Sequence, residues 1–270
     1  MLKIAGLDVN IGATPILRGI DLEVPSGTMC GLIGRNGAGK TTFMRAVMGA
    51  LAAKNGEMEF DTANIGAAPA HRRAHLGIGF MPEDRRLVPQ LTSEENILLP
   101  TWTTKFDGAE ERLAWIYKLM PEVEEFRNRG ATELSGGQQK FVAFARALMV
   151  GTKLLMLDEP SEGIAPVFAQ RMVEIMKTLK EEGESVLVAE SNDKHIKDLL
   201  DRTFVIERGS IISGETLRIP GRLPFALTLF KASVVIPVAD NKRGLCVRRH
   251  RNLFRARRSE YPGRRARLLR

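Results

Sequence analysis

The sequence opens with short stretches in which apolar and polar residues alternate, and these stretches predict β-strands. The alternation covers Leu2–Ile4, Leu7–Val9 and Ile20–Val24, and its period of two is that of a strand with one buried face. Thr28–Ile33 is mostly apolar, which favours a strand buried on both faces. Four further apolar runs predict strands: Leu76–Met81, Lys153–Leu157, Val186–Ala189 and Phe204–Ile206.

Helical patterns lie between these strands. We expect helices at Thr41–Leu51, Glu110–Met120, Ser135–Val150 and Val167–Glu181. Strands that alternate with helices predict an α/β fold with a largely parallel central sheet. Residues from about 85 to 150 lack convincing strands, so we expect a helical subdomain there.

The periodic pattern decays after residue 217, so we expect a folded domain at 1–217 and an irregular Arg-rich tail at 218–270. The tail holds 15 Lys and Arg against 2 Asp and Glu, whereas the rest of the chain holds 25 against 30. A basic tail can bind nucleic acid or anionic lipid, and it can equally be a disordered, solvated extension. A shifted reading frame in a GC-rich gene would encode a similar composition, and sequencing the coding DNA around codon 217 tests that hypothesis. No apolar run reaches the ~18 residues of a membrane-spanning helix.

A glycine-rich stretch follows the Thr28–Ile33 strand and fits the phosphate-binding pattern G-x-x-x-x-G-K-[ST]. Its glycines allow main-chain N–H groups to approach phosphate oxygens, and the next helix directs its positive end to the same place. The Lys40 ammonium is suited to the β- and γ-phosphates of a nucleotide, and the Thr41 hydroxyl to Mg²⁺. The predicted nucleotide-binding residues here are Gly34, Arg35, Asn36, Gly37, Ala38, Gly39, Lys40, Thr41 and Thr42.

Two carboxylates end the Lys153–Leu157 strand. In a protein with a phosphate loop, an aspartate at this point holds Mg²⁺ directly or through water, which is the role we expect for Asp158. An adjacent glutamate can polarise the attacking water as a general base, so Glu159 is the predicted catalytic base. The alternative is a strand end with two ordinary surface carboxylates.

The stretch Leu134-Ser135-Gly136-Gly137-Gln138 combines a serine helix cap with two glycines at a helix start. With the phosphate loop and the acidic strand end in this order, the chain resembles the ATP-binding subunits of ABC transporters from about Leu2 to Gly214. The resemblance implies a P-loop cassette with a RecA-like, mostly parallel sheet, an antiparallel β portion and a helical subdomain. It also implies that Ser135, Gly136, Gly137 and Gln138 close over the γ-phosphate of ATP held by a partner cassette.

Two stretches resemble the branched-chain amino-acid importer branch of that family, namely residues 77–96 and 158–166. Glu83 stands where the wider family has a glutamine that touches Mg²⁺ and the attacking water, and the alternative for Glu83 is a plain surface acid. Importers for urea and short amides share these features, so the transported solute stays open between them.

Two positions depart from the family pattern. Ile11 stands where the family stacks an aromatic ring on adenine, which predicts weaker ATP binding by the ring–ring contribution of ~0.5–1.5 kcal/mol. Ser191 stands where the family has a histidine, or in this branch a glutamine, that contacts the γ-phosphate and orients the base. Serine is shorter and can act through water, so we expect slow or partner-dependent hydrolysis. His195 is expected on a helix surface.

The resemblance implies an ATP hydrolase that uses ATP and Mg²⁺ and works at the cytoplasmic face of the inner membrane. The implied partners are a second cassette (identical or different), two transmembrane permease subunits and, indirectly, a solute-binding protein, with no nucleic acid. The alternatives are a nucleic-acid-associated ATPase with the same cassette and a non-hydrolysing regulatory subunit. The presence of Glu159, the predicted base, argues against a non-hydrolysing subunit.

Overall fold

A six-stranded sheet lies at the centre of the computed structural model, which describes residues 1–102 and 106–216 and so leaves out the predicted tail. Its strand order is β10-β9-β3-β8-β7-β6, and all neighbours are parallel except the edge strand β10. These strands are β3 (Met29–Ile33), β6 (Ile78–Met81), β7 (Leu154–Asp158), β8 (Val186–Glu190), β9 (Arg202–Glu207) and β10 (Ser210–Thr216). The carboxyl ends of β3, β7 and β8 therefore lie side by side at one edge, where Ile33 pairs with Glu190 and Asp158 with Ala189.

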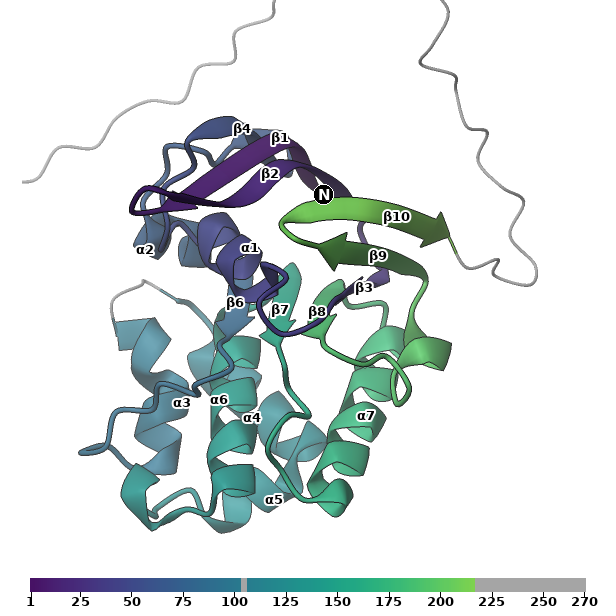
Figure 1. Cartoon of the computed structure of the whole chain (residues 1–270). Helices are drawn as coiled ribbons and strands as arrows, with labels where there is room; N and C mark the ends of the chain where they lie inside the picture. The colour runs from purple at the N-terminus through teal and green to yellow at the C-terminus, as the bar shows by residue number, and fades with distance from the viewer. Residues whose placement is uncertain (103–105, 217–270) are drawn as a thin grey trace, which may run out of the picture. The chain divides into compact units, whose positions relative to one another are not determined.

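A second, four-stranded antiparallel sheet has the order β2-β1-β4-β5 and lies above α1 in Figure 1. Its strands are β1 (Leu2–Ile11), β2 (Thr14–Val24), β4 (Asn55–Phe60) and β5 (Ala63–Asn64). The two short strands predicted before residue 10 form the single strand β1. Its alternation is interrupted because Gly6 has φ +59° and donates its N–H to the Asp21 carboxylate, which creates an irregular register.

Two apolar cores cover the two faces of the central sheet. Cys30, Leu32 and Leu187 face the antiparallel sheet and α1 (Lys40–Val47). Val186 and Val188 face the opposite core, which is built on α6 (Gly136–Val150) and α7 (Pro166–Glu181). Because successive residues of a strand point to opposite faces, a strand covered on both sides reads as a continuous apolar run. This confirms the predicted α/β fold with a mostly parallel sheet.

The predicted helical region contains α3 (Ser93–Trp102), α4 (Ala109–Leu119), α5 (Pro121–Glu125) and the short helix η1 (Ala131–Glu133) before α6. These helices lie below the sheet in Figure 1. Phe141 and Phe144 on α6 are buried in the core shared with the sheet, so α6 joins the two regions. Within the described ranges, none of the helices combines the length and apolar character needed to cross a bilayer.

Eight elements were not predicted individually from the sequence. These are β4, β5, β10, α3, α5, η1, the helix α2 (Ala70–His75) and the short helix η2 (Lys197–Leu199). Only Met58 and Phe60 of β4 are buried, so the strand buries too little apolar surface to show in the pattern. The α3 pattern is obscured by Pro100 within the helix.

Candidate active site

The phosphate loop connects β3 to α1 at the carboxyl edge of the sheet. Gly37 and Gly39 have φ of +81° and +116°, a left-handed conformation that residues with a Cβ adopt at a cost. Gly34 lies so close to β9 that an added Cβ would come within 2.4 Å of the main-chain oxygen of Ile206. The loop encloses a hollow of about 360 Å³, lined by Ile16, Asn36, Gly37, Gly39, Lys40, Thr41, Thr42, Glu83 and Glu159. Eight predicted site residues therefore surround one cavity.

Lys40 and Glu159 form a buried ion pair in this cavity. Lys40 Nζ lies 2.9 Å from Glu159 Oε1, and both side chains are 4% exposed. The same ammonium donates to Ser191 Oγ at 3.2 Å and to the main-chain oxygens of Gly34 and Arg35. An ammonium has three hydrogens, so the protein itself occupies Lys40 fully. A nucleotide phosphate has to displace one of these partners.

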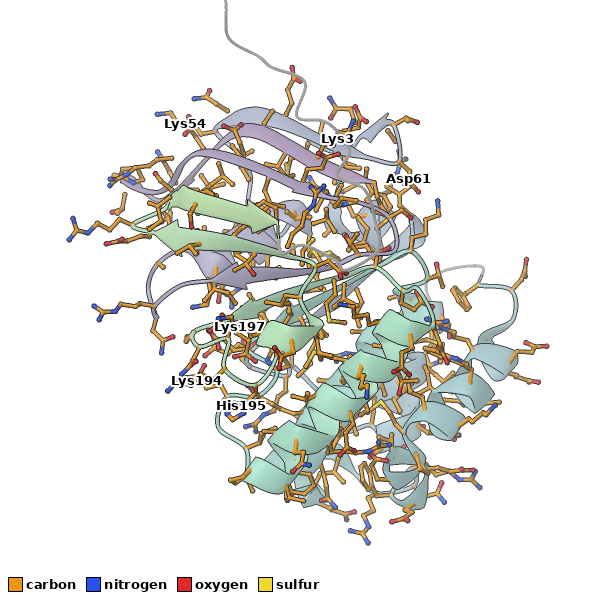
Figure 2. The ribbon with its side chains drawn as sticks, turned by 90° about the vertical axis from the view of Figure 1, so that its right-hand side faces the viewer. Lys3, Lys54, Asp61, Lys194, His195 and Lys197 are labelled. Atoms are coloured by element: carbon orange, nitrogen blue, oxygen red, sulfur yellow. The ribbon has the colours of Figure 1, made fainter. Side chains whose placement is uncertain are left out.

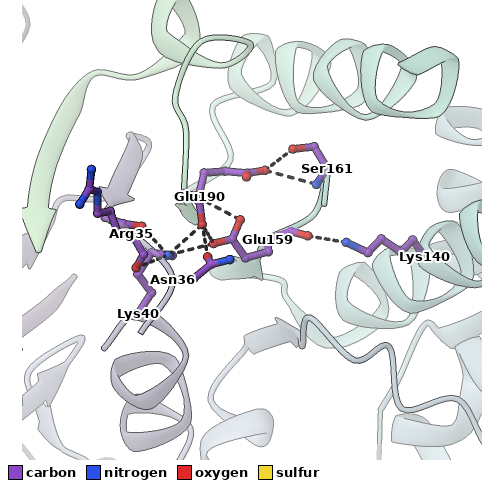
Figure 3. A network of polar contacts seen from close by, with 9 residues as sticks. Arg35, Asn36, Lys40, Lys140, Glu159, Ser161 and Glu190 are labelled. Carbon is purple, nitrogen blue, oxygen red and sulfur yellow. Dashed lines mark hydrogen bonds and ion pairs between the residues drawn. The ribbon is translucent and has the colours of Figure 1, made fainter. Parts of the chain in front are cut away.

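Ser191 contacts the predicted base directly. Its hydroxyl lies 2.6 Å from Glu159 Oε1, and its main-chain N–H donates to Glu159 Oε2 at 3.1 Å (Figure 3). Burial would raise the pKa of Glu159, but the hydrogen bonds from Ser191 and Lys40 outweigh burial and hold this pKa below its ordinary value. The Ser191 hydroxyl thus contacts the Glu159 carboxylate directly, without the bridging water considered from the sequence. Residue 191 follows β8, which pairs with β7, and Glu159 follows β7.

The Ser191 hydroxyl also lies 2.5 Å from Asn36 Oδ1. One hydroxyl hydrogen cannot serve two acceptors, and turning the Asn36 amide over presents its NH₂ to Ser191 instead. His195 lies in the turn after β8, not on a helix as expected. It is exposed beside Lys194 and Lys197 (Figure 2), and it lines a hollow of about 680 Å³ to which Glu159 and Ser191 also contribute.

Asp158 is fully buried at the end of β7. Burial raises its pKa to about 6; the Thr41 hydroxyl lies close enough to oppose this rise, but neither Asp158 oxygen accepts a well-formed hydrogen bond from a described residue. A buried carboxylate without donors beside a hydroxyl fits a divalent cation. Mg²⁺ usually binds through one or two protein groups together with phosphate and water oxygens. In agreement with that, the described residues contain no group of three His, Cys, Asp or Glu that would hold a metal alone.

Glu83 follows β6 and is exposed, and it lines the same hollow as Thr41. Its negative charge contributes to the raised pKa of Asp158. The structure therefore brings Glu83 to the predicted metal and water site, although no direct bond joins it to Asp158 or Thr41 among the described contacts.

The LSGGQ residues lie apart from the phosphate loop, at the start of α6. Ser135 Oγ accepts the N–H of Gln138 at 3.3 Å, and Gln138 Oε1 accepts the N–H of Ser135 at 2.9 Å, which forms a capping box. A Cβ on Gly137 would lie 2.8 Å from the Phe168 ring. None of these four residues lines a hollow described around the phosphate loop. The two sets of predicted nucleotide-binding residues are therefore separate in one chain, as the predicted head-to-tail pair of cassettes would require.

Three further residues, Glu190, Ser161 and Lys140, were not assigned a role from the sequence. Glu190 is a buried carboxylate that accepts the N–H and the hydroxyl of Ser161 at 3.2 and 2.6 Å, and burial raises its pKa to about 7. Lys140 is buried on α6 and donates to the main-chain oxygen of Glu159. A lysine within an apolar helix was the available signal.

The adenine side of the cavity also differs from expectation. Ile11 is 51% exposed and lines none of the hollows around the phosphate loop, whereas Ile16 on β2 lines the hollow that contains Lys40. The Ile11 position therefore stays a prediction, and Ile16 is the aliphatic residue that the fold places next to the loop.

Comparisons with known proteins agree with this geometry. Residues 17–162, more than half of the chain, match the family described as "ABC transporter". The high-affinity branched-chain amino acid transport ATP-binding protein BraG of Pseudomonas aeruginosa is 34% identical over 216 residues, which cover 80% of this chain and 93% of BraG. The lipopolysaccharide export system ATP-binding protein LptB of Escherichia coli is 31% identical, over 74% of this chain and 84% of LptB.

Solved structures give the same result. MJ0796, a dimeric ABC transporter cassette also solved after hydrolysis with ADP and Pi, superposes with a TM-score of 0.72 at 25% identity and covers 81% of this chain and 99% of that one. This chain belongs to the ABC transporter family, as one of its ATP-binding and ATP-hydrolysing cassettes.

Proposed function

We propose that the chain is the ATPase subunit of an importer for branched-chain amino acids. The proposed role in energy coupling rests on the buried ion pair between Lys40 and Glu159 at the phosphate loop. The solute class rests on the similarity to BraG and on the 77–96 and 158–166 stretches. The LptB similarity favours lipopolysaccharide export as a second candidate, and urea or short-amide import is the third.

The proposed reaction begins when the triphosphate replaces Glu159 on the Lys40 ammonium. Thr41 and Asp158 would hold Mg²⁺, with Glu83 nearby, and the ion would supply neutralisation of the phosphate charge. Glu159, released from Lys40 but still bonded to Ser191, accepts the proton of the attacking water. Because serine is shorter than the histidine or glutamine of the family at this position, slow or partner-dependent turnover remains the expectation.

The proposed partners follow from the two separate sets of predicted nucleotide-binding residues. We expect the capped glycines at 135–138 to cover the γ-phosphate of ATP held by a second cassette, which is either a copy of this chain or a different one. Two permease subunits would form the membrane passage, with a solute-binding protein that delivers the solute. The chain would then lie peripherally at the cytoplasmic face of the membrane.

The test is purification of a tagged chain from its own host under mild detergent, followed by identification of what comes with it. Two hydrophobic membrane subunits and a second cassette support a transporter. Uptake of labelled leucine into vesicles containing this complex, lost in a Glu159→Gln complex, supports branched-chain import. Co-purified nucleic acid or ribosomes would overturn the transport assignment, and bound lipopolysaccharide would favour export.

A further inference from the structure

Lys140 is a buried lysine whose only described hydrogen bond reaches the predicted base. Its side chain comes from the second turn of α6 and is 2% exposed. Its ammonium donates to the main-chain oxygen of Glu159 at 2.5 Å. Burial lowers the pKa of Lys140, which reflects the free-energy cost of keeping a cation away from water. A well-packed apolar residue would avoid that cost, so the hydrogen bond itself requires an explanation.

The main chain of Glu159 needs this kind of support. Glu159 has φ +47°, in the left-handed region that residues other than glycine, asparagine and aspartate rarely adopt. Such a conformation persists only where its surroundings over-determine it. The N–H of Glu159 donates to the Ala189 oxygen at 2.9 Å, and its C=O accepts from Lys140. The two peptide groups that flank this residue are therefore fixed from β8 on one side and α6 on the other.

The surrounding charges match this arrangement. The carboxylates of Glu190, Glu162 and Glu159 favour the charged form of Lys140, while Arg85 opposes it. Glu190 in turn accepts two hydrogen bonds from Ser161, two residues beyond Glu159. Figure 3 shows Lys140 approaching Glu159 from α6, on the side opposite to Lys40. Lys140 thus holds the 159–161 turn at the main-chain oxygen of Glu159, and Glu190 holds it at Ser161.

We propose that Lys140 is a positioning residue for ATP hydrolysis, which holds the main chain of Glu159 so that the carboxylate keeps its direction after Lys40 has moved to the phosphates. In the free chain Lys40 and Ser191 both hold the Glu159 carboxylate. When the triphosphate takes Lys40, one of these supports is lost. The Lys140 hydrogen bond acts on the main chain and is independent of the nucleotide, so it persists through the reaction.

The same contact joins two functional parts of one chain. Lys140 lies three residues after Gly137, on the helix that the capping box of Ser135 begins. A shift of the first turns of α6 therefore acts directly on the main chain of the base. The inference rests on the proposed role of Glu159 as the base.

The test compares Lys140→Met, Lys140→Arg and Lys140→Gln in the full-length chain, assayed with the subunits that co-purify with it. Methionine keeps the volume and removes the donor, and arginine keeps a charged donor. Glu159→Gln gives the background from other ATP sites, and Lys177→Met on the exposed face of α7 is the matched control. We expect Lys140→Met to lower kcat about 10- to 100-fold, the size of effect that a misplaced catalytic group causes. KM should stay within about twofold, and arginine should recover most of kcat, because ATP contacts do not involve Lys140.

A folded Lys140→Met with the kcat of Lys177→Met would overturn the proposal, as would equal losses in kcat and ATP binding, which indicate general damage. If Lys140→Met does not melt cooperatively, Lys140→Gln decides the question. Its shorter amide falls short of the carbonyl unless α6 moves, so a lowered kcat at unchanged KM supports the proposal and a normal kcat refutes it. If Glu159→Gln itself hydrolyses ATP, Glu159 is not the base and the proposed function fails. If Glu159→Gln is inactive and Lys140→Met is normal, only the proposal for Lys140 fails.

Discussion

Replacing Glu159 by glutamine tests whether the ion pair with Lys40 opposes ATP binding. In the free chain the Lys40 ammonium is fully engaged by Glu159, Ser191 and two main-chain oxygens. The γ-phosphate has to take the place of Glu159. Glutamine has nearly the same shape but lacks the negative charge, so its hydrogen bond from the ammonium is weaker and it competes less well for Lys40.

The magnitude follows from the type of bond exchanged. A hydrogen bond to a charged group contributes about 1.5–3 kcal/mol. We place the bond between two charged groups at the upper end of this range and the bond of the ammonium to glutamine at the lower end. The difference of about 1–1.5 kcal/mol corresponds to roughly fivefold to tenfold in an equilibrium constant. No discount for solvent screening applies, because both side chains are 4% exposed. We therefore expect Glu159→Gln to bind ATP about fivefold to tenfold more tightly while it loses hydrolysis by about 10²-fold or more.

Binding is measured by calorimetric titration of ATP into the full-length protein with EDTA present, so that no turnover and no metal contribute. Glu162→Gln is the control, because Glu162 is an exposed carboxylate three residues away and its removal changes the net charge equally. Equal or weaker ATP binding by a folded Glu159→Gln, relative to Glu162→Gln, would refute the competition between Glu159 and phosphate for Lys40.

Three further predictions use other residues of the site. Ser191→His should raise kcat, because imidazole reaches both the base and the γ-phosphate; a homodimer whose wild-type rate equals that of Ser191→His would contradict this. Ile11→Tyr should tighten ATP binding by the stacking contribution of ~0.5–1.5 kcal/mol, or about twofold to tenfold in the same titration, and an unchanged affinity would agree with the exposure of Ile11. Glu190→Gln should change how stability depends on pH. The pKa of Glu190 is raised to about 7 from 4.5, so the folded state holds this proton more tightly, and the associated stability is present below pH 4.5 and lost as pH rises through 7. At 1.36 kcal/mol per pKa unit, the free energy of unfolding of the wild type should fall by on the order of 3 kcal/mol relative to that of Glu190→Gln as pH rises through this range. Urea unfolding at pH 5 and pH 8 measures this change. A difference between the two proteins that does not vary with pH would show that Lys140 and Glu159, which face Glu190, compensate its titration.

The sequence alone located the site residues that are neighbours along the chain, but not the contacts between residues far apart in it. Phosphate-loop residues and the Asp158–Glu159 pair are contiguous and follow apolar runs, so the pattern located them and their strands. The contacts of Lys140 with Glu159 and of Ser161 with Glu190 join residues 19 and 29 positions apart on different elements. No periodicity reports such pairs, because they depend on how α6, β7 and β8 pack.

A similar limit applies to the strands themselves. Continuous apolar runs mark β7 and β8 because helices cover both faces of the sheet, and those predictions are confirmed to within one residue at each end. The edge strands β5 and β10 bury few side chains and gave no signal. Ile11 and Ile16 lie on either side of the β1–β2 hairpin, and only the twist of that hairpin decides which one approaches the phosphate loop.

The capping box at the start of α6 has a consequence for the timing of the cycle. The Ser135 hydroxyl accepts the Gln138 N–H and keeps its own hydrogen for an incoming acceptor, so this serine is ready to receive a phosphate as it stands. Lys40, by contrast, has first to leave Glu159. We therefore expect an order of events, in which ATP first separates Lys40 from Glu159 at the phosphate loop and the second cassette then docks on the bound γ-phosphate through Ser135.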